Sequence, residues 1–155
     1  MEIVRLVPDD WATFRDLRSA ALSEAPYAFG STLDDEHRLR EPDWRAKLAS
    51  RAQFVARDPG ALGTVGAYRD GDTIDLISMW VEPVARGRGI GAALVARVIA
   101  HARQLGCRQV RLWVTEGNDT AERLYTRCGF VRTGAVQPRR AGEPICEAEM
   151  VRAIA

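Results

Sequence analysis

A run of glycines and arginines lies near the middle of the chain, directly before the most regular helical pattern in the sequence. Gly87, Gly89 and Gly91 occupy alternate positions there, and Arg86 and Arg88 lie among them. Glycine has no Cβ, so the backbone can adopt conformations closed to other residues and a ligand can approach the main-chain N–H groups. The first N–H groups of a helix have no partner within it, and the helix dipole adds partial positive charge. Together with the two guanidinium groups, these features predict a site for a diphosphate.

The glycine spacing also fits a dinucleotide site. Gly87-x-Gly89-x-x-Ala92 satisfies the dinucleotide fingerprint, and Glu116 follows the next predicted strand, where a ribose-binding acid is expected. Three features count against this interpretation. Pro83 and the residues up to Arg86 separate the glycines from the preceding strand, an antiparallel meander comes first, and only about forty residues follow Glu116. A P-loop is excluded because no Gly-Lys-Ser/Thr follows the glycines. A dinucleotide-dependent enzyme therefore stays an alternative.

The elements around the glycine loop follow from hydrophobic spacing. Apolar residues form one helical stripe from Ile90 to about Leu105, and Gly106 ends the pattern. A strand is predicted over 108–115, and a helix begins at Asn118 and reaches Arg127 or Cys128. A strand, helix and strand of this length predict a right-handed parallel crossover.

The remaining elements are mostly antiparallel strands. We expect a strand over 3–7, a helix capped by Asp9 or Asp10, a loop over 23–30, and one broken or two short helices over 34–50. The other predicted strands are 53–57, 62–69 and 73–81 as a meander, then 130–136 and 145–152. The sequence thus predicts one α/β domain over 1–155. Its mixed, largely antiparallel central sheet forms a single layer, with flanking helices and one parallel β-α-β crossover.

Composition excludes several classes of function. The formal net charge is +1, which argues against nucleic acid or an anionic membrane as the main partner. No apolar run approaches the roughly 20 residues that a membrane span needs. Cys107, Cys128 and Cys146 form no CxxC pair, and with two histidines they predict no metal site. An odd number of cysteines without a secretory leader predicts a cytoplasmic protein.

Two motifs in register resemble the GNAT superfamily of N-acetyltransferases. Arg86-x-x-Gly89-x-Gly91, after a strand that ends at Val81, resembles the family's coenzyme A pyrophosphate loop. A second stretch resembles the family's short helix that ends in Gly-Phe: Asn118-x-x-Ala121-x-x-Leu124-Tyr125-x-x-Cys128-Gly129-Phe130. Pro26-Tyr27-Ala28-Phe29-Gly30 also resembles many bacterial members, so the resemblance spans nearly the whole chain.

The resemblance implies that the strands 73–81 and 108–115 splay apart and admit the pantetheine arm of acetyl-CoA. Main-chain groups of Met79 and Val81 would pair with the pantetheine amides like an added strand. Asn118 would hydrogen-bond the arm, although a plain helix cap is an equal alternative. The implied acetyl-CoA contacts are Met79, Trp80, Val81, Arg86, Gly87, Arg88, Gly89, Ile90, Gly91, Ala92 and Asn118.

The implied reaction transfers an acetyl group directly to a primary amine of a small molecule or peptide. A neutral amine attacks the thioester, an oxyanion develops and a thiolate leaves. In the family, a main-chain N–H near Val81 binds the oxyanion, and Tyr125 matches the general acid, whose ordinary pKa of about 10 keeps it protonated. The alternative for Tyr125 is a core tyrosine. Cys128 is rejected as a nucleophile because transfer is direct and no histidine is placed to activate it.

The general base and the acceptor stay open at the level of sequence. Glu82 follows the key strand and is our candidate base, while a surface charge or a water relay are alternatives for every acid. The other candidate bases are Glu36, His37, Glu116 and Glu143. Phe29 and Glu36 are candidate acceptor contacts, and Trp80 and Trp113 could line the same pocket.

Two further expectations come with the resemblance. A non-catalytic acyl-CoA-binding sensor on the same fold is the alternative to the enzyme. Members of the family often pair through their C-terminal strands, so a homodimer is also implied.

Overall fold

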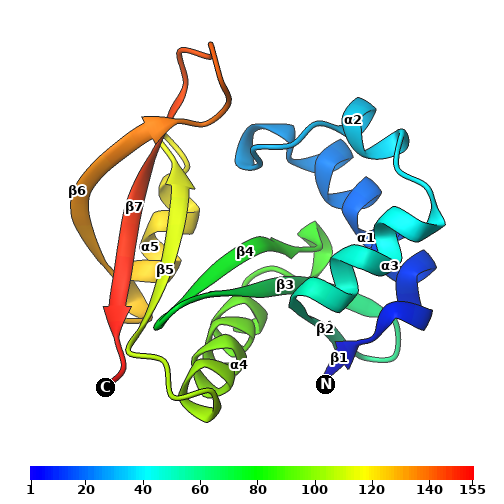
Figure 1. Cartoon of the computed structure of the whole chain (residues 1–155), viewed down its shortest axis with the longest axis horizontal. Helices are drawn as coiled ribbons and strands as arrows, with labels where there is room; N and C mark the ends of the chain where they lie inside the picture. The colour runs from blue at the N-terminus through cyan, green and yellow to red at the C-terminus, as the bar shows by residue number, and fades with distance from the viewer.

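A seven-stranded sheet with helices on both faces makes up the computed structural model, which describes residues 1–155 (Figure 1). The strands are β1 Glu2–Leu6, β2 Ala52–Arg57, β3 Ala61–Asp70, β4 Thr73–Val81, β5 Gln109–Thr115, β6 Val131–Pro138 and β7 Cys146–Ala153. They lie in the order β1-β2-β3-β4-β5-β7-β6. Every neighbouring pair is antiparallel except β4 and β5. This confirms the predicted mixed sheet with one parallel crossover.

The helices are α1 Trp11–Glu24, α2 Leu33–His37, α3 Glu41–Ser50, α4 Ile90–Gln104 and α5 Asp119–Arg127, with 3₁₀ turns η1 Pro8–Asp10, η2 Pro26–Ala28 and η3 Pro83–Ala85. The segment expected to hold one or two helices forms two, because Pro42 lies in the first turn of α3, where its missing N–H is tolerated. No helix combines the length and the apolar character that crossing a bilayer requires.

Some predicted boundaries were wrong. The first strand ends at Leu6 rather than at residue 7, and α1 continues to Glu24 inside the expected loop. Asp10 precedes α1, but its carboxylate accepts from the N–H of Val7 at 2.8 Å and so caps η1 instead. The last two strands each extend further than predicted, to Pro138 and Ala153.

Two apolar cores cover opposite faces of the sheet. The larger joins the sheet to α4 and α5, and it includes the α4 residues Leu94, Val98 and Ala102, which are fully buried as their spacing predicted. The smaller joins α1 and α3 to β2 and the end of β4, around the edge-to-face pair of Phe14 and Trp44. The sheet therefore separates an α4/α5 face from an α1/α3 face, and a ligand that contacts both must pass through the sheet.

Candidate active site

The two parallel strands stay together only at their first residues. Their last registered pair is Asp75 with Arg111, and the guanidinium group donates to both carboxylate oxygens, at 2.6 and 2.9 Å. Beyond this pair β4 has no partner on that side, whereas β5 continues to pair with β7 as far as Thr115. Figure 1 shows β4 and β5 diverging towards their C-terminal ends. The stretch 76–81 of β4 is thus an open strand edge in the middle of the sheet.

A bulge in β4 accompanies the divergence. Thr64 of β3 pairs with Trp80 and Gly66 pairs with Ile77, so two β4 residues, Ser78 and Met79, face one residue of β3. Ser78 has a φ of 56°, a left-handed conformation that is uncommon outside glycine. A bulge bends a strand and increases its local twist. It therefore accounts for the turn of β4 away from β5.

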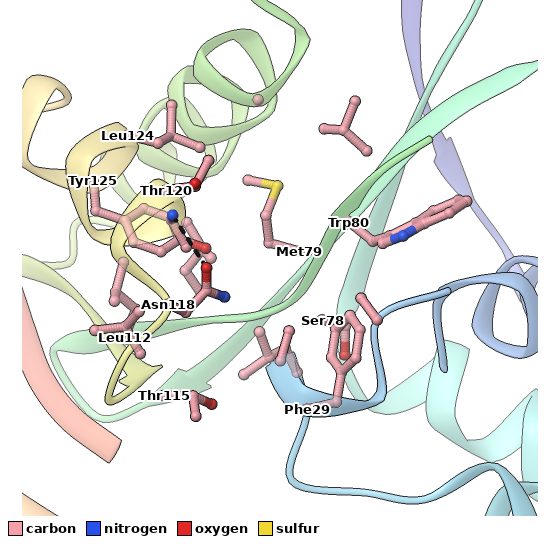
Figure 2. Close-up of a pocket in the computed structure, with 18 of the residues that line it drawn as sticks. Phe29, Ser78, Met79, Trp80, Leu112, Thr115, Asn118, Thr120, Leu124 and Tyr125 are labelled. Atoms are coloured by element: carbon pink, nitrogen blue, oxygen red, sulfur yellow. Dashed lines mark hydrogen bonds between the residues drawn. The ribbon is translucent and has the colours of Figure 1, made fainter. Parts of the chain in front are cut away.

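A cavity of about 1000 Å³ occupies the gap between the strands (Figure 2). Its volume lies at the upper end of ordinary small-molecule sites. On the α4/α5 face it is bordered by the glycine loop and by Asn118, Leu124 and Tyr125. On the α1/α3 face it reaches Arg18 and Phe29. The cavity therefore connects the two faces of the sheet through the opening.

The glycine loop presents unpaired main-chain donors at one end of this cavity. Gly87 and Gly89 have φ of 81° and 79°, and an added Cβ would meet nothing within 4 Å, so the backbone conformation explains these glycines. At Gly91 a Cβ would lie 2.9 Å from the Leu124 side chain, so close packing of α4 and α5 explains that one. The six N–H groups from Gly87 to Ala92 donate to no other group of the protein. They are free to bind an anion at the positive end of α4.

The arginines of the loop are placed differently from the prediction that both add charge for a diphosphate. Arg86 lines the cavity, but it donates to the Val81 carbonyl at 3.0 Å and to Glu24 at 2.8 Å. Arg88 is exposed, does not line the cavity, and reaches only the carbonyl of Val84. Arg86 therefore joins the end of β4 to the end of α1, and the unpaired donors of the loop are main-chain N–H groups.

Trp80 has a structural partner of its own. Its indole N–H donates to Glu24 at 2.9 Å, and its ring belongs to the smaller core while also lining the cavity. Burial tends to raise the pKa of Glu24, but the hydrogen bonds from Trp80 and Arg86 outweigh it and lower the pKa. Sequence reasoning missed Glu24, because nothing in its local spacing distinguishes it from other acids on α1.

Tyr125 and Asn118 come to the cavity from α5 and the turn before it. Tyr125 is 7% exposed, and its ring packs edge-to-face against Phe130. Burial, with a smaller effect from Cys128, raises the pKa of Tyr125 above its usual value, so the phenol stays protonated at neutral pH. The Asn118 side chain accepts from the N–H of Ala121 at 3.4 Å, as the dashed line in Figure 2 shows, and so caps α5.

On the α1/α3 face, a buried ion pair replaces the free carboxylate expected at Glu36. Arg18 donates to Glu36 through Nε at 3.0 Å and Nη2 at 2.6 Å, and the Phe29 ring lies 5.0 Å from the guanidinium carbon. Arg18 and Phe29 line the cavity, whereas Glu36 does not. Burial tends to raise the pKa of Glu36, but the hydrogen bonds and the charge of Arg18 outweigh this effect and lower the pKa. Glu36 is thus a partner of Arg18 and has no contact with the cavity as a base or acceptor group.

Comparison with known proteins bears on this geometry. The model of the Acetyltransferase (GNAT) family matches residues 11–130. The chain belongs to the GNAT acetyltransferase family. The predicted resemblance is therefore confirmed.

Individual relatives agree with this assignment. Over 126 residues, the chain is 32% identical to a mycothiol acetyltransferase of Thermobispora bispora, covering 75% of this chain but 41% of that protein. The chain thus spans well under half the length of this curated relative. An acetyltransferase of the GNAT family from Streptococcus pneumoniae superimposes with a TM-score of 0.82 at 21% identity, over 99% of each chain. The putative acetyltransferase yncA from Salmonella typhimurium, solved with its cofactor acetyl-CoA, gives 0.76 at 23% identity, over 100% of this chain and 94% of that one. At these identities the two structures establish the shared GNAT fold.

None of the five candidate bases lines the cavity of this GNAT domain. Glu82, His37, Glu116 and Glu143 do not line it. Glu116 is within 3.2 Å of Arg132, and Glu143 pairs with two arginines of the β6–β7 connection. No three His, Cys, Asp or Glu side chains are arranged to bind a metal ion.

Two carboxylates that the sequence did not single out do line the cavity, Asp75 and Glu147. Asp75 is neutralised by Arg111. Glu147 of β7 pairs with Thr115 of β5, and one of its oxygens accepts from Gln137 at 2.7 Å while the other has no partner. Trp113, two residues before Thr115 on the same face of β5, lines the cavity as expected. Glu147 reaches the cavity because β7 pairs with β5. The sequence did not predict this pairing.

Proposed function

We propose that this GNAT domain transfers an acetyl group from acetyl-CoA directly to a primary amine of a small molecule or peptide. The observation that carries the proposal is the set of six free N–H groups from Gly87 to Ala92 beside the open edge of β4. Such donors at a helix N-terminus fit the pyrophosphate of coenzyme A. The acetyl-CoA complex of a protein with the same fold supports the choice of ligand.

The open edge of β4 fits the pantetheine arm. Glu82 N–H donates to the carbonyl of Leu62 at 2.9 Å, so the alternation of an antiparallel ladder turns the N–H of Val81 away from β3 and towards the gap. The carbonyl of Val81 is already bonded to Arg86. We therefore assign the Val81 N–H, with the main chain of Met79, to the pantetheine amides or to the carbonyl oxygen of the thioester.

The chemistry then uses groups on both faces of the sheet. The neutral amine attacks the thioester carbonyl, and the C–N bond forms as the carbonyl oxygen takes negative charge beside the Val81 N–H. Collapse of this intermediate breaks the C–S bond, and Tyr125 donates its proton to the departing thiolate. Glu147, rather than Glu82, accepts the proton that the amine loses, because it is the cavity carboxylate with an unoccupied oxygen.

Turnover with a panel of amines tests this proposal. We expect one free coenzyme A thiol for each N-acetylated product, identified by mass, with at least one class of primary amine. Acetyl-CoA at one hundred times its dissociation constant should also stabilise the fold by about 2.7 kcal/mol, and NADH should not. Stabilisation by acetyl-CoA without turnover on any amine would favour the acyl-CoA sensor. Stabilisation by NADH alone would favour a dinucleotide enzyme.

A further inference from the structure

The α1/α3 end of the cavity contains more positive than negative charge. Arg18 and Arg51 both line it, and Glu36 forms an ion pair with Arg18. Burial, and then repulsion from Arg18, lowers the pKa of Arg51. Burial and the charge of Arg51 lower the pKa of Lys47. The nearby Asp75 is neutralised by Arg111. This end of the cavity therefore favours an anionic ligand group.

Two nitrogen atoms in this region lack a partner. The Arg18 side chain is 8% exposed, and Glu36 occupies its Nε and Nη2, leaving Nη1 buried with no hydrogen bond. The Nε of Arg51 is also buried and unpaired. Buried donors are almost always paired in folded proteins, and leaving a charged one unpaired is costly. Glu36 fixes the plane of the Arg18 guanidinium, and Arg18 lines the cavity, so the direction of its free Nη1 is defined.

We propose that the acceptor amine carries a carboxylate, which binds to Arg18 and Arg51 while the amine end extends towards the opening between β4 and β5. The inference rests on the proposed acetyl transfer and narrows its substrate class to amino acids and related amino-carboxylates. The planar guanidinium matches a carboxylate in geometry as well as in charge. Phe29, stacked on Arg18, provides an apolar wall beside the charged end.

A matched series of acceptors tests this inference. We would measure kcat/KM for α-, β- and γ-amino acids, each beside its amide, with spermidine as an amine without a carboxylate. We expect the best amino acid to exceed its amide by at least about 10-fold, the effect of hydrogen bonds to a charged group. The amide has the less basic amine, so a larger fraction of it is the neutral nucleophile at neutral pH. A preference for the amino acid would therefore arise in spite of its smaller fraction of neutral amine. Equal or better activity with the amide or spermidine would overturn the inference and leave the proposed function standing.

Arginine variants test which side chains cause the preference for the acid. Arg51→Gln should remove most of the preference for the acid over its amide. Arg18→Lys keeps the charge beside Glu36 and should weaken the preference because it loses the planar group. Arg38→Gln is the matched control, since it removes one positive charge from a side chain that is 81% exposed on the same face. A preference unchanged in Arg51→Gln and Arg18→Lys would overturn the assignment.

A binding measurement gives an answer even without turnover. Calorimetry with coenzyme A present should detect binding of the N-acetylated form of the best-recognised amino acid. Arg51→Gln should weaken this binding about 10-fold. If no amine is acetylated but this binding is seen, the proposed reaction fails and the carboxylate site stands. If no N-acetylated amino acid of the panel binds the wild-type protein, the carboxylate site fails.

Discussion

The two halves of the cavity are built from different parts of the chain. On the α4/α5 face the site is made of main chain, with free N–H groups from Gly87 to Ala92 and the bulged edge of β4. On the α1/α3 face it is made of side chains, with Arg18 oriented by Glu36 and covered by Phe29. A main-chain site depends on backbone conformation and tolerates many side chains. A side-chain site depends on individual residues brought together by the fold, and in the proposed function it selects the acceptor.

The largest expected effect comes from a substitution in the main-chain half of the cavity. Gly89→Val places a β-branched residue at a φ of 79° and obstructs the N–H groups of the loop. We expect coenzyme A to bind on the order of 1,000-fold more weakly by calorimetry, the loss of about two charge-assisted hydrogen bonds.

Gly106→Val is the matched control for that change. Gly106 follows the other end of α4, has a φ of 73°, and an added Cβ there would likewise meet nothing within 4 Å. It should strain the backbone equally and leave coenzyme A binding unchanged. Equal weakening by both variants would show that loss of stability, rather than loss of donors, explains the result.

The next effect concerns the side-chain half. Glu36→Gln leaves Arg18 buried beside a neutral group and should lower the free energy of unfolding by about 3 kcal/mol in urea titrations at pH 7. The pKa of Glu36 is lowered in the folded protein, so its contribution is present above the unfolded pKa and is lost as pH falls through the folded value. The difference between wild type and variant should therefore shrink below about pH 4.

An exposed ion pair on a neighbouring helix provides the comparison. Glu41 lies 3.0 Å from Arg45 and is 51% exposed, so Glu41→Gln should change stability by under about 1 kcal/mol. If Glu36→Gln were as mild as this control, the buried pair would not position Arg18.

Tyr125→Phe tests the chemistry between the halves. The substitution removes only the hydroxyl, so kcat should fall about 100-fold, the lower end of general acid catalysis, while coenzyme A binds as before. Because burial raises the pKa of Tyr125, the wild-type rate should show no loss from its ionisation up to pH 10. An unchanged kcat would remove Tyr125 from the general-acid role or show that a later step limits turnover.

The smallest expected effect is at the base. Glu147→Gln should lower kcat/KM about 10-fold, less than usual for a catalytic base because water in the cavity can also accept the proton. The wild-type kcat/KM should fall at low pH as Glu147 becomes protonated, and this fall should be smaller in the variant. Glu82→Gln, which alters a carboxylate outside the cavity, should leave the pH profile unchanged. The reverse pattern would return the role to Glu82.

The difference between the halves also explains what the sequence could predict. Gly87 and Gly89 are needed by the local backbone, so their spacing alone predicted the loop, and the apolar stripe of α4 predicted the helix behind it. The order of the central strands followed in the same way. The bulge at Ser78 has no such signal, since serine does not mark a left-handed position.

The side-chain half of the cavity could not be predicted from local sequence patterns. Arg18 and Glu36 are 18 residues apart, and Glu147 reaches the cavity through the pairing of β7 with β5. Glu82 was a reasonable candidate by proximity in sequence, yet the turn after β4 carries it away from the cavity. Tertiary contacts, which short-range spacing does not encode, decide these positions.

Amide hydrogen exchange, measured by mass spectrometry with and without coenzyme A, tests the central claim most directly. The N–H groups from Gly87 to Ala92 have no partner in the protein, so they should exchange quickly in the free form and be strongly protected on binding. Protection should extend to the open edge of β4 at Met79 and Val81. Coenzyme A that binds while these amides exchange as fast as before would contradict the account.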